Sequence, residues 1–307
     1  MFSKGSMDDM PNPSRSLKKT SDPPRQLTHR EDIPQPATAG PPRAIEHVRR
    51  MRGGSQPHTL RCSDGHYYVA KVPNNPQGVR ILVNELLGSR LAALLRLPVA
   101  IGRVILVEQE LIRYSPEMVI QNNLGETPCQ AGMWFGSCYP VDPRFGEVDD
   151  LLPLSETTNH VDFLGMLVFD KWAGNTDGRQ VVFSRNRECR HFTAVMIDQG
   201  CCFNATEWNF PDSPLRGRYC RTGTYDGVKG MDSFEPWLSR LESEIDENAL
   251  LSAAHGIPPE WYEGQADSLC DLLEKLDHRR RIVRELLWAT HNSYHQIFPN
   301  WTSFSKQ

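Results

Sequence analysis

Apolar and polar positions divide the chain into an irregular leader and two patterned halves. Residues 1–42 are rich in Pro, Ser, Lys, Arg and Asp and carry almost no apolar periodicity. Such a segment cannot bury enough apolar surface to offset the entropy that it loses on ordering. We therefore predict a disordered N-terminal tail over residues 1–42, which acts either as a plain solvated leader or as a regulatory arm.

The first half, residues 43–137, carries a strand-like pattern. Two β-rich runs flank Asp64-Gly65, a dipeptide that is typical of hairpin turns. Residues 47–52, ahead of these runs, are basic and favour a helix or a turn. Further strands are expected at residues 104–107 and 118–120.

One helix interrupts these strands. Over residues 79–96 the leucines return at helical spacing, and Pro98 ends the pattern. The spaced residues are Leu82, Leu86, Leu91, Leu94 and Leu95. The first half is thus predicted to be a small sheet with one packed helix.

The second half, residues 138–307, is mainly helical in pattern. An apolar helix is expected over residues 161–172, followed by a strand pair at residues 181–183 and 194–197. Beyond them, apolar residues between 269 and 287 trace one amphipathic stripe. The whole pattern predicts an α+β protein with a small β-rich N-lobe, residues 43–137, and a helical C-lobe, residues 138–307.

Composition narrows the class of protein. The 307 residues, 39% hydrophobic and 23% charged, are enough for a sizeable core in one large domain or two lobes. A net charge of −4 disfavours a nucleic-acid partner. No stretch approaches the roughly 20 consecutive apolar residues that a membrane span needs, and the polar start does not resemble a secretion signal. We expect a soluble protein with no membrane partner.

The 8 cysteines indicate the compartment. They form no Cys-x-x-Cys motif and no Cys/His pair at zinc-finger spacing, and Cys201 and Cys202 are adjacent. This usage suits neither a zinc site nor an easy structural disulfide. We interpret the cysteines as reduced thiols of a cytoplasmic protein.

A glycine-rich turn is the first candidate for chemistry. Gly53, Gly54 and Ser55 directly precede the predicted hairpin. Two glycines let a backbone approach a phosphate closely, and free N–H groups and a hydroxyl can donate to its oxygens. A flexible turn without a ligand fits the same three residues, so the turn alone decides nothing.

A lysine and a glutamate form the second candidate. Lys71 ends the apolar run Tyr67-Tyr68-Val69-Ala70, and Glu85 follows on the predicted helix with small residues on its own side. A strand lysine paired with a helix glutamate is how kinases hold the α- and β-phosphates of ATP. An edge-strand lysine and a solvated glutamate remain the alternative.

Two carboxylate-bearing segments complete the set. Asp170, Asn175, Asp177 and Gln180 lie where the predicted helix turns into the strand pair, and Asp198 ends the second strand just before Gln199-Gly200. Taken alone, Asn-Thr-Asp-Gly is a good β-turn. A carboxylate, a short hairpin and a strand-Asp-x-Gly are, however, the order in which kinases present a base and a metal ligand.

These segments together resemble the HipA-like kinase domain, which is distantly related in layout to the phosphatidylinositol 3/4-kinases. The resemblance covers about residues 43–288, and its motifs are specific in order and spacing more than singly. The matching runs are residues 68–71, Asn84-Glu85, residues 169–177 and residues 197–203.

The resemblance implies a bilobal, protein-kinase-like fold with ATP between the lobes. Lys71 would hold the phosphates, Asp177 would be the catalytic base and Asp198 would bind Mg²⁺. Gly53, Gly54 and Ser55 would match the phosphate loop. Phe135 and Ser137 would lie at the hinge between the lobes.

One departure from the family pattern matters. The family usually has Asp-Arg-His and then a metal-binding Asn about five residues after the catalytic Asp, whereas this chain has Gly178-Arg179-Gln180 and then Val182. Gln180 could replace the missing ligand, or the second metal could be lost. In an alternative register Asp170 is the base and Asn175 the ligand. We favour Asp177, because Asp170 lies inside the predicted helix.

Three functions follow from these residues. The leading hypothesis is a Mg-ATP-dependent phosphotransferase acting on a protein Ser/Thr or a small-molecule hydroxyl. The alternative is a pseudokinase that binds nucleotide and serves as an interaction module with little catalysis. Transfer of AMP in place of phosphate is a third possibility, which needs the nucleotide bound in the reverse sense.

Overall fold

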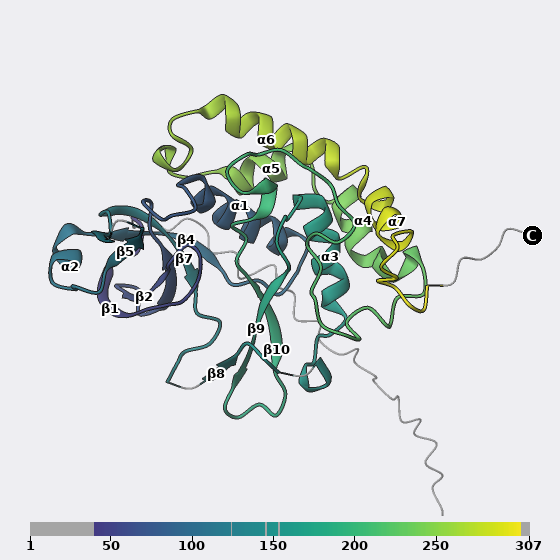
Figure 1. Cartoon of the computed structure of the whole chain (residues 1–307), viewed down its shortest axis with the longest axis horizontal. Coiled ribbons are helices and arrows are strands. Elements are labelled where there is room, and N and C mark those ends of the chain that lie inside the picture. The colour runs from purple at the N-terminus through teal and green to yellow at the C-terminus, as the bar shows by residue number, and fades with distance from the viewer. Residues whose placement is uncertain (1–39, 124, 145, 153, 302–307) are drawn as a thin grey trace, which may run out of the picture. The chain divides into compact units, whose positions relative to one another are not determined.

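A curled antiparallel sheet forms the first half of the chain. The computed structural model describes residues 40–123, 125–144, 146–152 and 154–301, so that the predicted tail lies almost wholly outside the described residues. The sheet has the strand order β1-β2-β3-β7-β4 (Figure 1). Its strands are β1 Ala44–Arg50, β2 His58–Cys62, β3 Tyr67–Lys71, β4 Gly102–Val107 and β7 Gly132–Cys138.

The structure corrects the prediction at the start of the sheet. Residues 47–52, expected as a basic helix or turn, form most of strand β1 and the turn after it, and Arg50 lies opposite His58 of β2. Charged outward-facing residues hid the strand pattern, because β1 buries little more than Ala44. The backbone N–H of Leu106 in β4 donates to Pro42 O, 2.8 Å away, which brings the start of β1 to the far side of the sheet.

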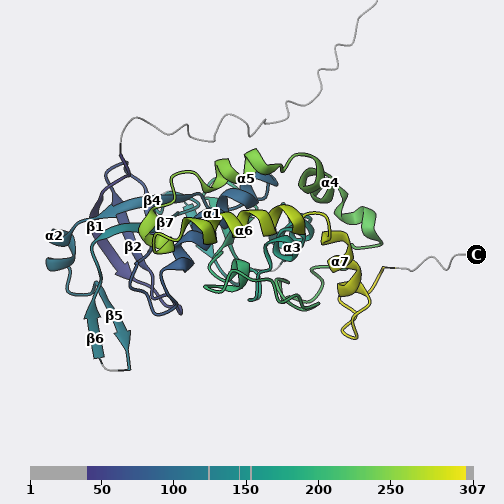
Figure 2. The same ribbon diagram turned by 90° about the horizontal axis from the view of Figure 1, so that it is seen from above.

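A small core fills this curled sheet. It gathers buried apolar residues of the five strands and of the segment between β4 and β7, among them Leu60, Tyr68, Ile105 and Trp134. That segment contains helix α2, Gln109–Arg113, and the hairpin of β5, Val119–Asn122, with β6, Gly125–Pro128. Figure 2 shows the hairpin projecting away from the sheet.

Helix α1, Arg80–Leu94, confirms the helix predicted from the leucine spacing. Its buried leucines belong to the larger core, which they share with residues of the helical second half such as Leu167 and Leu272. The helix between the sheet strands therefore packs mainly on the second half of the chain. The contact is reinforced by Arg90, whose Nη1 donates to Ala253 O at 2.8 Å and His255 O at 2.7 Å.

The second half is built on helix α3, Asp162–Ala173, which ends at Gly174 in the left-handed conformation (φ 59°). It is followed by β9, Gln180–Asn186, and β10, Thr193–Ile197, which confirm the predicted strand pair. A strand that the sequence did not predict, β8 Gly146–Asp149, pairs with the outer edge of β9. Asp170 thus lies near the end of α3, Asp177 between α3 and β9, and Asp198 directly after β10.

Helices complete the second half. The predicted amphipathic stripe is divided between two of them, because residues 280–282 break the helix. They are α4 Glu235–Ser243, α5 Glu247–Ala254, α6 Ala266–Arg279 and α7 Val283–His291, with short 3₁₀ turns η1 Leu154–Glu156, η2 Cys202–Asn204, η3 Met231–Phe234 and η4 Pro259–Tyr262. The predicted division into a β-rich first part and a helical second part is confirmed.

None of the helices in the described residues is both long enough and apolar enough to cross a bilayer.

Candidate active site

The structure brings Lys71 and Glu85 together, as the sequence predicted. Lys71 is the last residue of β3, Glu85 lies on α1, and their exposed fractions are 6% and 2%. The Lys71 ammonium donates to Glu85 and also to Asp198 Oδ1, 2.9 Å away. We call these three residues the open cluster, because the Asp198 side chain remains 34% exposed.

Charge balance fixes the protonation of the open cluster. Burial works to lower the pKa of Lys71, but the Glu85 and Asp198 carboxylates outweigh it and raise that pKa above its usual value. Burial likewise works to raise the pKa of Asp198, and the Lys71 ammonium holds it below the usual value. Burial raises the pKa of Glu85 to about 7. An ammonium facing an ionised, partly exposed Asp198 is therefore the state at neutral pH.

The loop after β10, residues 198–208, lies directly against α1. We call it the post-β10 loop. The Gln199 N–H donates to Glu85 Oε2 at 2.9 Å. A Cβ at Gly200 would lie 2.9 Å from Ile81 Cγ2 and 3.1 Å from Glu85 Oε1, so only glycine permits this approach. The closeness of helix and loop thus explains why glycine stands two residues after Asp198.

Asp177 and Gln180 lie on the catalytic segment, residues 174–180, and both are exposed. The Gly178 N–H donates to Asp177 Oδ1 at 2.7 Å, and Gln180 Nε2 is 3.5 Å from Asp177 Oδ2. The Thr176 N–H donates to Cys201 O at 3.1 Å, which ties the catalytic segment to the post-β10 loop. The candidate base and the candidate metal ligand therefore lie on neighbouring, hydrogen-bonded loops.

The alternative base, Asp170, is enclosed. It forms an ion pair with Arg179, and neither side chain has any exposed surface. Asn175 Nδ2 donates to Asp170 Oδ1 at 3.0 Å. We call Asp170, Asn175 and Arg179 the sealed cluster. Because its carboxylate and amide are already bound to one another, the register that makes Asp170 the base leaves no accessible group for a substrate.

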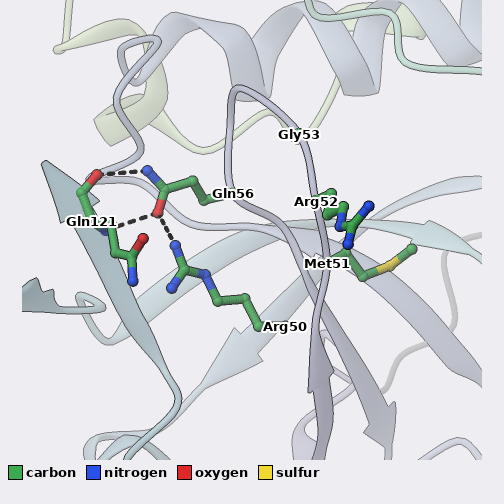
Figure 3. Close-up of a pocket in the computed structure, with 6 residues that line it drawn as sticks. All are labelled: Arg50, Met51, Arg52, Gly53, Gln56 and Gln121. Atoms are coloured by element: carbon green, nitrogen blue, oxygen red, sulfur yellow. Dashed lines mark hydrogen bonds between the residues drawn. The ribbon is translucent and has the colours of Figure 1, made fainter.

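The glycine turn lies between β1 and β2, with Gly53 and Gly54 exposed and Ser55 buried. Gln56 fastens the turn to β5: its Oε1 accepts from the Gln121 N–H at 2.8 Å, and its Nε2 donates to Gln121 O at 2.6 Å (Figure 3). A cavity of about 460 Å³ beside the turn is lined by Arg50, Met51, Arg52, Gly53, Gln56 and Gln121. Lys71 is not among the lining residues, so this cavity does not join the glycine turn to the open cluster.

Phe135 and Ser137, expected at the hinge, lie within strand β7. Phe135 is opposite Lys71 of β3 and Val104 of β4, and Ser137 is opposite Val69. The Phe135 side chain is 2% exposed and belongs to the larger core. Strand β7 pairs with β3 on one side and with β4 on the other, and it continues to Cys138. The hinge role of Phe135 and Ser137 stays a prediction.

Sequence reasoning gave no role to two residues that organise the site. Arg179 Nη1 donates to Ile197 O at 2.9 Å, which joins the sealed cluster to the strand end that carries Asp198. Asn84, next to Glu85, binds the post-β10 loop by four hydrogen bonds. A buried amide at an inward position of α1 was the signal that could have found it.

Most of the chain matches a known protein family. The model of the HipA-like kinase family matches residues 44–295. The chain belongs to the HipA-like kinase family. No curated protein is similar enough to count as a match.

Solved kinase structures are similar to this chain at low sequence identity. CtkA, a proinflammatory kinase of Helicobacter pylori, has a TM-score of 0.52 at 16% identity, over 79% of this chain and 94% of that one. Hydra Fam20 has 0.46 at 13% identity, over 83% and 87%, and the Golgi casein kinase has 0.43 at 14%, over 82% and 74%. The likeness to CtkA identifies this HipA-like kinase as kinase-like in fold.

Proposed function

We propose that this HipA-like kinase is a Mg-ATP-dependent phosphotransferase that acts on the hydroxyl group of a protein Ser/Thr or a small molecule. The open cluster carries the proposal. A buried ammonium bound to two carboxylates, one of them partly exposed, is poised to exchange a carboxylate contact for phosphate oxygens. A lysine that served only the core would need no accessible partner.

Asp177 is assigned as the base. Its carboxylate takes the proton of the acceptor hydroxyl while the hydroxyl oxygen forms a bond to the γ-phosphorus of ATP. The bond between that phosphorus and the β–γ bridging oxygen breaks, and ADP leaves with the electron pair. The exposure of Asp177 supports this assignment over the enclosed Asp170.

Asp198 and Gln180 would hold the magnesium ion, which would neutralise charge on the β- and γ-phosphates. The described residues contain no group of three or more His, Cys, Asp or Glu side chains placed to hold a metal. Magnesium nevertheless usually takes one or two protein carboxylates and fills its remaining positions with phosphates and waters. The partly exposed Asp198 and the exposed Gln180 fit one such ion.

One observation favours a pseudokinase instead. Val182, at the position of the family's metal-binding Asn, lies in strand β9 opposite Val195 and has no atom that can bind a cation. With one ligand missing, nucleotide binding without transfer is the second candidate function.

Mass spectrometry after incubation with Mg-ATP separates the candidates. The purified protein is incubated alone and with a dephosphorylated protein mixture, and both are searched for added mass. We expect phosphate, lost in Asp177→Asn and kept in the control Asp271→Asn, which changes an exposed carboxylate on α6. Added AMP would assign nucleotidyl transfer. Stabilisation by Mg-ADP without any product would assign the pseudokinase, and neither effect would refute the proposal.

A further inference from the structure

Asn84 makes four hydrogen bonds with the post-β10 loop. Its side chain has no exposed surface. Nδ2 donates to the carbonyl oxygens of Gly200 at 2.8 Å, Cys202 at 3.0 Å and Ala205 at 2.8 Å. Oδ1 accepts from Trp208 Nε1 at 2.9 Å. A single amide thus binds this loop at four places.

The backbone of the post-β10 loop explains why such an amide is needed. Non-glycine residues rarely adopt positive φ, yet this loop does so at Asp198, Phe203, Asn204, Ala205 and Trp208. Short backbone bonds within the loop, such as Cys202 N–H to Gln199 O at 2.9 Å, satisfy only part of its polar groups. Buried carbonyl groups need a donor, and the two N–H groups of Asn84 serve three carbonyls of this loop, so that one N–H is shared between two of them.

Neighbouring residues of α1 hold the same loop. Four residues before Asn84, the Arg80 guanidinium lies 4.8 Å over the Trp208 ring, and its Nη1 is 3.3 Å from Thr206 O. Glu85 accepts from the Gln199 N–H. Residues four apart share a helix face, so this face of α1 acts as a template along which the loop is laid.

We propose that Asn84 is a positioning residue for the metal site: it fixes the post-β10 loop so that the Asp198 carboxylate is presented to the cation. The metal part of this inference rests on the proposed function. The loop part does not, because it concerns the backbone conformation of residues 198–208 without any ligand. Partners that orient a metal ligand typically change metal affinity by roughly 10–100-fold when they are mutated.

The test is Asn84→Asp, which keeps the shape of the side chain and removes both N–H donors. Its matched control is Asn159→Asp. Asn159 Nδ2 also donates to a backbone carbonyl of β10, Ala194 O at 3.0 Å, but at the end of the strand remote from Asp198. Trp208→Phe serves as a milder variant, since it removes one hydrogen bond to Asn84 and keeps a ring under Arg80.

Two measurements are made on each full-length variant. Hydrogen exchange followed by mass spectrometry reports on residues 198–208 without ligand. Thermal shift with ADP, first in EDTA and then over a MgCl₂ series, gives the Mg²⁺ concentration for half of the metal-dependent shift. For Asn84→Asp we expect faster exchange in the loop and a Mg²⁺ requirement raised roughly 10–100-fold, with the shift by metal-free ADP unchanged.

The outcomes separate this inference from the proposed function. Asn159→Asp should lower the melting temperature without changing the Mg²⁺ requirement. Trp208→Phe should raise the Mg²⁺ requirement, as Asn84→Asp does, but by less. Unchanged loop exchange in Asn84→Asp and Trp208→Phe would overturn the positioning role. An unchanged Mg²⁺ requirement would overturn its link to the metal. A wild-type protein without any Mg²⁺-dependent shift would overturn the proposed function and that link, while exchange would still decide the loop.

Discussion

The sealed and the open cluster are both buried groups of opposite charges, and they differ in access. In the sealed cluster the Asp170 and Arg179 side chains have no exposed surface, and Asn175 takes up a carboxylate oxygen of Asp170. In the open cluster Lys71 and Glu85 are nearly as deep, but the third member, Asp198, is 34% exposed. Burial of charge alone therefore does not mark the reactive site in this chain.

Access to solvent distinguishes an ion pair that only holds the fold together from one that can bind a ligand. A buried ion pair must repay the cost of removing both charges from water, so its presence is weak evidence of either stability or function. The sealed cluster has no group left to offer to a ligand. Its contribution to the site is indirect, because Arg179 Nη1 also holds Ile197 O beside Asp198. The open cluster keeps one partly exposed carboxylate, that of Asp198, which the proposed function requires.

The largest expected effect is on stability, in the sealed cluster. Asp170→Asn leaves the Arg179 guanidinium buried without a counter-charge, which should lower the free energy of unfolding by about 3–5 kcal/mol. Asp177→Asn, on the exposed catalytic segment, should change it by no more than about 0.5 kcal/mol. Urea denaturation of both variants measures the difference. Equal losses would contradict the distinction between an enclosed and an accessible carboxylate.

Lys71→Met tests the open cluster. It leaves the buried Glu85 carboxylate without its cation, which should lower the free energy of unfolding by about 1–3 kcal/mol. It should also remove most of the stabilisation by Mg-ATP, about 2.7 kcal/mol for ligand at a hundredfold its dissociation constant. Thermal shift with and without Mg-ATP gives both values.

A second buried lysine of the described residues, Lys171, is the control for Lys71→Met. Lys171 Nζ donates to three backbone carbonyls, Ser213 O, Pro214 O and Arg216 O, at 2.9 to 3.0 Å. Lys171→Met should reduce stability and leave the ligand-induced shift intact. If Lys71→Met keeps the full shift, Lys71 does not contact the nucleotide.

Asp198→Ala should affect stability less than Asp170→Asn or Lys71→Met. The Lys71 ammonium keeps Glu85 as its partner, and an ion pair with a partly exposed carboxylate such as Asp198 contributes roughly 0–1 kcal/mol. Metal-dependent binding of ATP should nevertheless disappear, and phosphotransfer with it. Isothermal titration with ATP in EDTA and in MgCl₂ measures this. Metal-dependent affinity that survives the substitution would place the cation elsewhere.

Local sequence patterns predicted the elements whose apolar residues recur at one period or form distinct runs. The leucine spacing predicted α1, although residues 81–89 of that helix are all buried, and two apolar runs separated by a turn predicted the strand pair β9–β10. Strand β1 was missed, since its outward charges outnumber its buried positions. Strand β7 was missed because it pairs on both sides and carries two glycines, so that no alternation survives.

The residues of the site likewise include some that the sequence predicted and some that it did not. Lys71 and Glu85 were predicted from chemical type and order, because a lysine that ends an apolar strand needs an anionic partner. The roles of Arg179 and Asn84 could not be predicted in that way. Arg179 meets Ile197 through the β9–β10 hairpin, in which the next residue, Gln180, pairs with Ile197. Asn84 meets a loop more than 110 residues distant in the chain, and only the packing of α1 against that loop brings the two together.

Substitution of Gln180 should have the smallest and most specific effect, because this side chain lies at the accessible end of the site. Its Nε2 is 3.5 Å from Asp177 Oδ2, so the amide makes at most a weak bond within the protein and can turn its oxygen to a cation. Gln180→Asn shortens that arm by one methylene. It should leave stability within about 0.5 kcal/mol and raise, severalfold, the Mg²⁺ concentration for half-maximal phosphotransfer. Gln109→Asn, on an exposed glutamine at the start of α2, is the control. An unchanged Mg²⁺ requirement would leave Asp198 as the sole protein ligand, and then Val182 would mark a metal position that the chain has lost without replacement.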